Sequence, residues 1–157
     1  MGNAAEDMQF TYELTGTGWS AGYLTIGSRH TKLTASYLGD ALGDLLAAVL
    51  AVAEGHASAR ASWDEEPGEY RWVFDREDAL VHVRVLWFRE LWSDDDDDAG
   101  EERLSGTVTM PALVSVMAAA ARKVLDDYGA SEYKRAWVEH PFPEDTLRAL
   151  EAIEQAG

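Results

Sequence analysis

One serine stands in a pattern typical of hydrolase nucleophiles. Residues 18–22 read GWSAG, which matches G-x-S-x-G with Ser20 in the nucleophile position. That chemistry needs a strand, a sharp turn and then a helix, with a His and an acid as partners. Here the motif opens a strand within a predicted hairpin, and we find no Asp and His with a matching role. We therefore predict no catalytic residue, although a small enzyme stays an alternative below.

Sequence patterns for cofactors and metals are also incomplete. Residues 16–21, GTGWSA, match part of a dinucleotide-binding fingerprint, but a strand follows where that motif requires a helix. The chain has no Cys, which excludes thiolate ligands and disulfides. The four histidines are dispersed and form no helical pair; they are His30, His56, His82 and His140. We predict no cofactor and no metal site.

Residues 93–102, SDDDDDAGEE, carry seven carboxylates and no basic residue. An EF-hand calcium loop needs Gly at its sixth position and Glu at its twelfth. Counting from either of the first two aspartates breaks that pattern, and strands rather than helices flank the loop. We expect a mobile, solvated hairpin loop, with weak divalent-cation binding as the open alternative. Its aspartates are Asp94, Asp95, Asp96, Asp97 and Asp98.

Basic side chains gather on one face of the predicted sheet. If a four-residue loop joins each pair of strands in 57–88, one cross-strand row contains Arg60, Val73 and His82. The next row contains Ser62, Arg71 and Arg84. Arg71 opposite Arg84 is unfavourable unless an anion lies nearby. Internal carboxylates would supply it, and the candidates are Glu13, Asp64, Glu69 and Asp75. The alternative is a site for an external anion or an acidic partner, formed by Arg60, Arg71, His82 and Arg84.

Hydrophobic periodicity predicts the elements that position these residues. Alternation and turn signals predict seven strands, at 8–15, 19–27, 30–36, 57–63, 69–74, 80–88 and 103–110. A helix between Ser36, as N-cap, and Gly55 follows the third strand. Three more helices are predicted at 111–128, at 131–139 and from Pro143 onward. The order predicts a single α+β domain over 1–157, with a mostly antiparallel sheet of six to seven strands and helices packed on one face.

Composition narrows the class of partner. The 157 residues include 29 acidic and 13 basic residues, for a net charge of −16. Such a chain is a poor ligand for nucleic acid or for an anionic membrane, and its acidic surface suits a basic protein. The N-terminus has no secretory signal pattern, so we expect a cytoplasmic protein. An exposed edge strand could support a homodimer, but no residue specifies one.

Three stretches carry a resemblance. TASYLGDALGDLLAAVLAVAEG (34–55), ARASWDEEPGEYRWVF (59–74) and WVEHPFP (137–143) resemble small acidic proteins of unknown function from high-GC actinobacteria. That resemblance implies no functional residue.

Two functions follow as hypotheses. The first is a non-catalytic intracellular protein that binds a basic partner through its acidic surface, as immunity proteins and inhibitors do; it rests on an analogy of size and charge. The alternative is a small-molecule or anion-binding domain, or a small enzyme. It would use the Arg-bearing outer sheet face or a pocket between sheet and helices.

Overall fold

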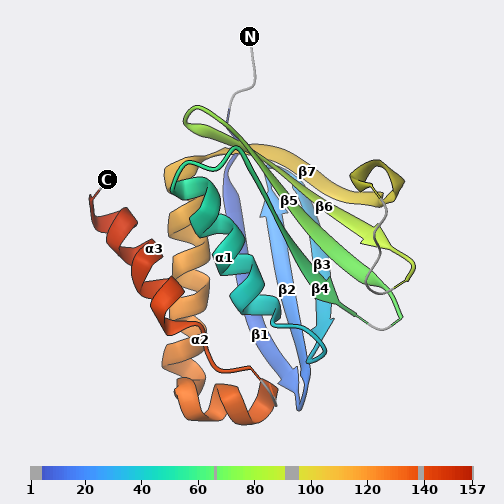
Figure 1. The fold of residues 1–157 in the computed structure, drawn as a ribbon, viewed down its shortest axis with the longest axis vertical. Coiled ribbons are helices and arrows are strands. Elements are labelled where there is room, and N and C mark those ends of the chain that lie inside the picture. Colours follow the sequence, from blue (N-terminus) through green and yellow to red (C-terminus); the bar gives the residue numbers. More distant parts are fainter. Residues whose placement is uncertain (1–4, 66, 91–95, 138–139, 157) are drawn as a thin grey trace.

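The computed structural model describes residues 5–65, 67–90, 96–137 and 140–156 (Figure 1). The strands are β1 (Met8–Gly16), β2 (Trp19–Ile26), β3 (Arg29–Ser36), β4 (Ser58–Asp64), β5 (Glu69–Glu77), β6 (Leu80–Phe88) and β7 (Glu101–Thr109). The helices are α1 (Ala41–Ala53), α2 (Met110–Trp137) and α3 (Glu144–Ala156), with a short 3-10 helix, η1 (Asp97–Ala99). The predicted α+β class and the antiparallel strand pairing are confirmed.

The seven strands form two sheets rather than one. One sheet has the order β1-β2-β3 and the other has the order β4-β5-β6-β7, with every pair antiparallel. Aromatic side chains join the inner faces: the rings of Phe10 and Trp72 lie 5.5 Å apart, and those of Tyr12 and Trp63 lie 5.7 Å apart. The chain leaves the first sheet after β3 and enters α1, which carries it to β4. Two smaller sheets therefore surround one core.

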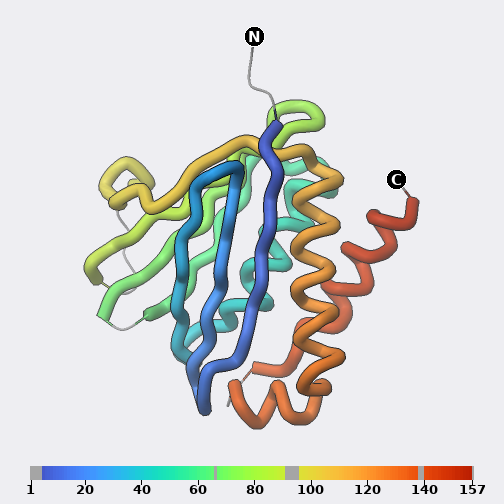
Figure 2. The backbone as a smooth tube through the Cα atoms, turned by 180° about the vertical axis from the view of Figure 1, so that it is seen from behind, coloured from blue at the N-terminus to red at the C-terminus, as the bar shows by residue number. Residues whose placement is uncertain are grey.

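The helices complete that core. Figures 1 and 2 both show α2 running beside β1, and α1 lies along β4, with α3 packed on both helices. Their buried side chains include Leu42, Leu45, Leu113, Val124 and Leu150. These join the aromatic side chains of both sheets in one cluster. Within the described residues, no helix combines the length and the apolar character needed to cross a bilayer.

The cross-strand register is confirmed for one hairpin and wrong for the next. β4 and β5 pair as predicted, with Trp63 opposite Tyr70. Between β5 and β6, however, the loop has two residues rather than four, and Glu77 lies opposite Leu80. Asp78 makes this tight turn with φ at 55°, a conformation that Asp tolerates better than most residues. The register therefore differs by two residues from the prediction, and every side chain keeps its face.

Helix boundaries follow local chemistry. The N-cap of α1 is Asp40, whose side chain accepts a hydrogen bond from the Gly43 amide, and not Ser36 as predicted. Ser36 instead ends β3, opposite Trp19. The predicted end of a helix at Gly129 is a sharp break inside α2, where φ is 76° and ψ is 158°. Glycine reaches this backbone conformation without a steric penalty.

Candidate functional site

Three arginines that the sequence analysis named as candidate site residues converge on one carboxylate. Arg60 on β4 donates from Nε to both oxygens of Asp97 at 3.0 and 3.1 Å, and its Nη2 also bonds Asp97. Arg71 on β5 donates from Nη1 to Asp97 at 3.0 Å. Arg84 on β6 lies with Nη2 at 3.7 Å from the same carboxylate and 3.5 Å from Asp75. We call these four residues, Arg60, Arg71, Arg84 and Asp97, the arginine cluster.

The corrected register explains how the arginine cluster forms. Arg60, Val73 and Arg84 now occupy one row across β4, β5 and β6, while Arg71 lies opposite Leu86. The predicted like-charge pair of Arg71 and Arg84 is therefore wrong, because the two side chains lie in neighbouring rows. Their positions let both guanidinium groups reach the same carboxylate.

Burial makes the cluster's charges interact strongly. The side chains of Arg71 and Asp97 are only 10% and 14% exposed, whereas Arg60 is 47% exposed. The guanidinium of Arg71 also lies over the ring of Phe88, 4.2 Å from its centre. Hydrogen bonds from Arg60, reinforced by those from Arg71, lower the pKa of Asp97 to about 2. Its own hydrogen bonds to Asp97 raise the pKa of Arg60. At neutral pH, Asp97 is ionised and held by cations.

Asp97 belongs to the acidic stretch 93–102, for which the sequence predicts a mobile, solvated hairpin loop. It begins η1, which is followed by Gly100. A Cβ on Gly100 would lie 2.8 Å from the ring of Phe88 and 3.0 Å from Cβ of Leu86, so this backbone packs directly on the outer sheet face. Phe88, Leu86 and Val73 form a second small hydrophobic cluster on that face. Asp96 and Asp98 are exposed, and Asp94 and Asp95 lie outside the described residues.

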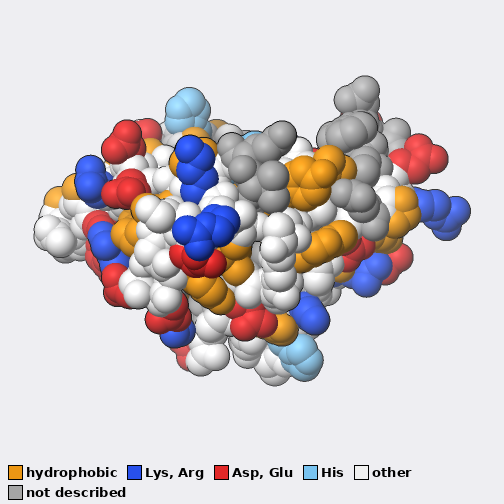
Figure 3. Space-filling view, turned by 90° about the horizontal axis from the view of Figure 1, so that it is seen from below, with side chains coloured by type: hydrophobic (Ala, Val, Ile, Leu, Met, Phe, Trp, Pro, Cys, Tyr) orange, Lys and Arg blue, Asp and Glu red, His pale blue; other side chains and the backbone are white. Residues whose placement is uncertain are grey.

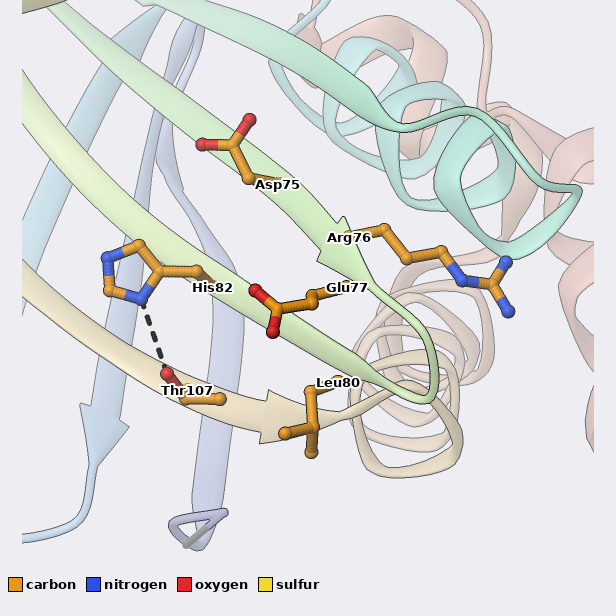
Figure 4. Close-up of a pocket in the computed structure, with 6 residues that line it drawn as sticks. All are labelled: Asp75, Arg76, Glu77, Leu80, His82 and Thr107. Atoms are coloured by element: carbon orange, nitrogen blue, oxygen red, sulfur yellow. Dashed lines mark hydrogen bonds between the residues drawn. The ribbon is translucent and has the colours of Figure 1, made fainter. Parts of the chain in front are cut away.

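His82 does not join the arginine cluster. It lies in another row, opposite Asp75 on β5 and Thr107 on β7, at a pocket of about 230 Å³ (Figure 4). Its Nδ1 lies 3.3 Å from Oγ1 of Thr107. Asp75 pairs with Arg84 instead of His82. Arg76, also at this pocket, points away and donates to the Val52 carbonyl at the end of α1. An acid, a histidine and a hydroxyl thus share a row without the linked hydrogen bonds of a catalytic triad.

The G-x-S-x-G serine is buried in the core. Ser20 is 1% exposed near the start of β2, beside the hydroxyl group of Tyr12. The strand continues to Ile26, so the sharp turn into a helix that the nucleophile motif needs is not formed here. In the part of the chain that the structure describes, no three His, Asp or Glu side chains are arranged to hold a metal ion.

A second group of carboxylates lies near the start of α1, and sequence analysis missed it as a group. Asp44 belongs to the first turn of the helix, Asp40 caps it, and Asp64 at the end of β4 approaches Gly39. Partial burial, together with the charges of Asp40 and Asp64, raises the pKa of Asp44 to about 6, and His140 opposes this effect. Partial burial also raises the pKa of Asp40. The sequence shows two acids near the start of this helix, but not that Asp64 of β4 lies beside them.

Comparisons with known proteins find a similar fold among solved structures. No family model matches the chain, and no curated protein matches it. Among solved structures, a chain of the structure described as "CdiA-CT/CdiI toxin and immunity complex from Enterobacter cloacae" is similar in fold. The identity is 10% and the TM-score is 0.52, over 73% of this chain and 99% of that chain. At this identity the match shows a shared fold.

Proposed function

We propose that this chain is a non-catalytic protein that binds a basic protein partner through an acidic surface, as an immunity protein or an inhibitor does. The observation that carries the proposal is that Arg60, Arg71 and Arg84 are paired with carboxylates of the chain itself: Asp97, Glu69 and Asp75. These arginines were the strongest candidates for an external anion site. Because three internal carboxylates balance these three arginines, the surplus charge left for a partner is negative.

Elsewhere in the described residues, ion pairs also hold basic side chains against carboxylates of the same chain. Of the 13 Lys and Arg residues, nine form ion pairs with Asp or Glu side chains of the described residues. The 29 acidic residues exceed the basic ones by 16, so many carboxylates stay without a cation of their own. A surface of this kind attracts a basic protein and accelerates its association. The likeness to a chain from a toxin and immunity complex supports a protein as the partner.

Capture of the partner from the organism that encodes the chain tests this function. The tagged protein is incubated with lysate at low salt and washed with rising salt, and bound proteins are identified by mass spectrometry. We expect one basic protein that rebinds in purified form and dissociates as salt rises, because screening weakens attraction between exposed charges. Recovery of no partner at low salt would count against the proposal, as would a purified partner whose affinity is independent of salt.

A second candidate function is anion binding, since three guanidinium groups converging on one carboxylate form a geometry that also suits a ligand carboxylate or phosphate. It requires Asp97 to leave the arginine cluster. Inorganic phosphate should then raise the melting temperature of Asp97→Asn more than that of the wild type. Further replacement of Arg71 and Arg84 by Ala should abolish the shift. Equal shifts in wild type and Asp97→Asn would eliminate this candidate.

A further inference from the structure

Exposed hydrophobic side chains gather at one end of the molecule. Among the described residues, four large hydrophobic side chains are exposed, and three of them are neighbours there: Trp19 (42%), Tyr37 (38%) and Leu38 (39%). Trp19 lies opposite Ser36 across β2 and β3, and the ring of Tyr37 packs on Gly18. Figure 3 looks onto the end that carries the β1–β2 turn and the start of α1, and shows hydrophobic groups at the surface among both acidic and basic ones.

The backbone beneath these side chains is fixed by buried indoles. Trp63 donates from Nε1 to the Ala41 carbonyl at 2.9 Å, and Trp137 donates to the Gly39 carbonyl at 3.1 Å. The Tyr37 amide donates to the Gly18 carbonyl at 2.9 Å. Three hydrogen bonds thus fix the connection between β3 and α1. A rigid apolar surface loses little conformational entropy when a partner binds, and Trp and Tyr are common among residues that dominate binding energy.

Two carboxylates beside this surface, those of Asp40 and Asp44, differ from Asp97 in their ion pairing. Among the described residues, no Lys or Arg forms an ion pair with Asp40 or Asp44, whereas Asp97 is bound by three arginines. Partial burial raises the pKa of Asp44, the negative charges of Asp40 and Asp64 add to this effect, and His140 opposes it. A cation brought by a partner would relieve that repulsion.

A shallow groove extends from Asp44 between α1 and β4. Its volume is about 430 Å³. Asp44, Ser62 and Arg60, which pairs with Asp97, line it together with alanine methyl groups of α1 and β4: Ala47, Ala48, Ala51, Ala59 and Ala61. The aliphatic part of a Lys or Arg side chain can lie on such methyl groups while its charge reaches a carboxylate. Both the apolar surface and the groove therefore suit a partner that combines hydrophobic and basic side chains.

We propose that Trp19, Tyr37 and Leu38, with Asp40 and Asp44 beside them, form the docking surface for the basic protein partner. This inference rests on the proposed function and names the place where it acts. The hydrophobic side chains supply the buried centre of the interface, and the carboxylates supply a rim that selects a basic partner.

The test uses a short synthetic peptide containing Arg and Leu as the probe, titrated into the isotope-labelled full chain at low salt. Amide and indole NMR shifts should change around Trp19 and residues 37–44. Leu38→Asp and Asp44→Lys should each weaken binding roughly tenfold or more, as expected for residues central to an interface. Both positions are exposed, so both variants should fold. Two matched controls should bind as the wild type does: Tyr23→Ala, at an exposed aromatic residue (41%) elsewhere on β2, and Glu54→Lys, the same charge change beyond the other end of α1.

Three outcomes would overturn the inference, and they differ in what they leave standing. The NMR shift changes could centre on another acidic region, with Asp44→Lys and Glu54→Lys having equally small effects on peptide binding. The proposed function would then stand, but the docking surface would lie elsewhere on the molecule. If the peptide does not bind the wild-type chain at all, this would count against both the proposed function and the proposed docking surface. A concentration-dependent dimer that Leu38→Asp abolishes in sedimentation experiments would show that a second copy of the chain covers this surface.

Discussion

Replacing Asp97 by Asn tests whether the arginine cluster stabilises the fold. The substitution keeps the size of the side chain and one acceptor oxygen while it removes the negative charge. Arg60, Arg71 and Arg84 then face each other without their shared anion. Arg71 keeps a more distant partner, Glu69, at 3.9 Å, so its charge is not left isolated.

The size of the expected destabilisation follows from how exposed each arginine that binds Asp97 is. The pair with Arg60 is half exposed, and such pairs contribute about 0.2–1 kcal/mol. The bond from the buried Arg71 is of a kind that contributes about 1.5–3 kcal/mol. Since Glu69 and the Asn oxygen compensate in part, we expect Asp97→Asn to reduce the free energy of unfolding by about 2 kcal/mol. The melting temperature of a chain of this size should fall by roughly 4–8 °C.

Urea unfolding followed by tryptophan fluorescence measures this change, and its pH dependence identifies the cause. The lowered pKa of Asp97, about 2, means that its stabilisation is complete above the unfolded value of 3.8 and is lost as the pH falls toward 2. The difference between wild type and Asp97→Asn should therefore disappear over that range. Asp98→Asn, an exposed neighbour in η1, is the control and should have little effect. Equal stability of the two variants, or a difference that persists at pH 2, would refute the reasoning.

Further substitutions test other features by the same urea assay. Asp44→Asn should stabilise the protein by about 0.5 kcal/mol at pH 7, the scale of a like-charge pair four residues apart on a helix. Because the folded pKa of Asp44 is raised to about 6, the wild type loses stability as the pH rises from about 4 to 6, so this gain should vanish near pH 4. Asp78→Gly should stabilise by about 0.5 kcal/mol, since glycine adopts the positive φ without strain. Gly22→Ala should destabilise by about 1–3 kcal/mol, because its Cβ would lie 2.9 Å from the rings of Phe10 and Trp63. A neutral or opposite effect in any variant would contradict the contact or charge that it tests.

Alternation along the strands predicted which residues face the core, because strand side chains alternate strictly between faces. It could not determine the register between β5 and β6. A shift of two residues leaves Val81, Val83 and Val85 on the same face, so both registers satisfy the pattern. The turn at Asp78 decides between them, and its positive φ has only a weak sequence signal in Asp.

The arginine cluster shows a similar limit. Arg60, Arg71 and Arg84 could be assigned to the outer face from alternation alone, and the need for a nearby anion followed from their charges. The identity of that anion did not follow, because Asp97 reaches them only when its loop packs on Phe88. Loops have no periodicity from which such a contact can be predicted. The available signal was that the acidic loop joins β6 to β7, and β6 carries Arg84.

The positions of α1 and α2 also restrict how this protein can associate. β1 and β4 are outer strands of their sheets, and α2 and α1 lie along them. In addition, Tyr128 of α2 donates to the Leu14 carbonyl on β1. Backbone groups at the outer edge of a sheet are otherwise free to pair with a strand of another molecule, which leads to domain swapping or fibril growth. On β7, the Thr107 carbonyl accepts a hydrogen bond from the Glu6 amide at 2.8 Å and the Ser105 carbonyl accepts one from the Arg29 guanidinium. Together with the packing of α1 and α2, these contacts protect the chain against polymerisation through the edges at β1, β4 and β7.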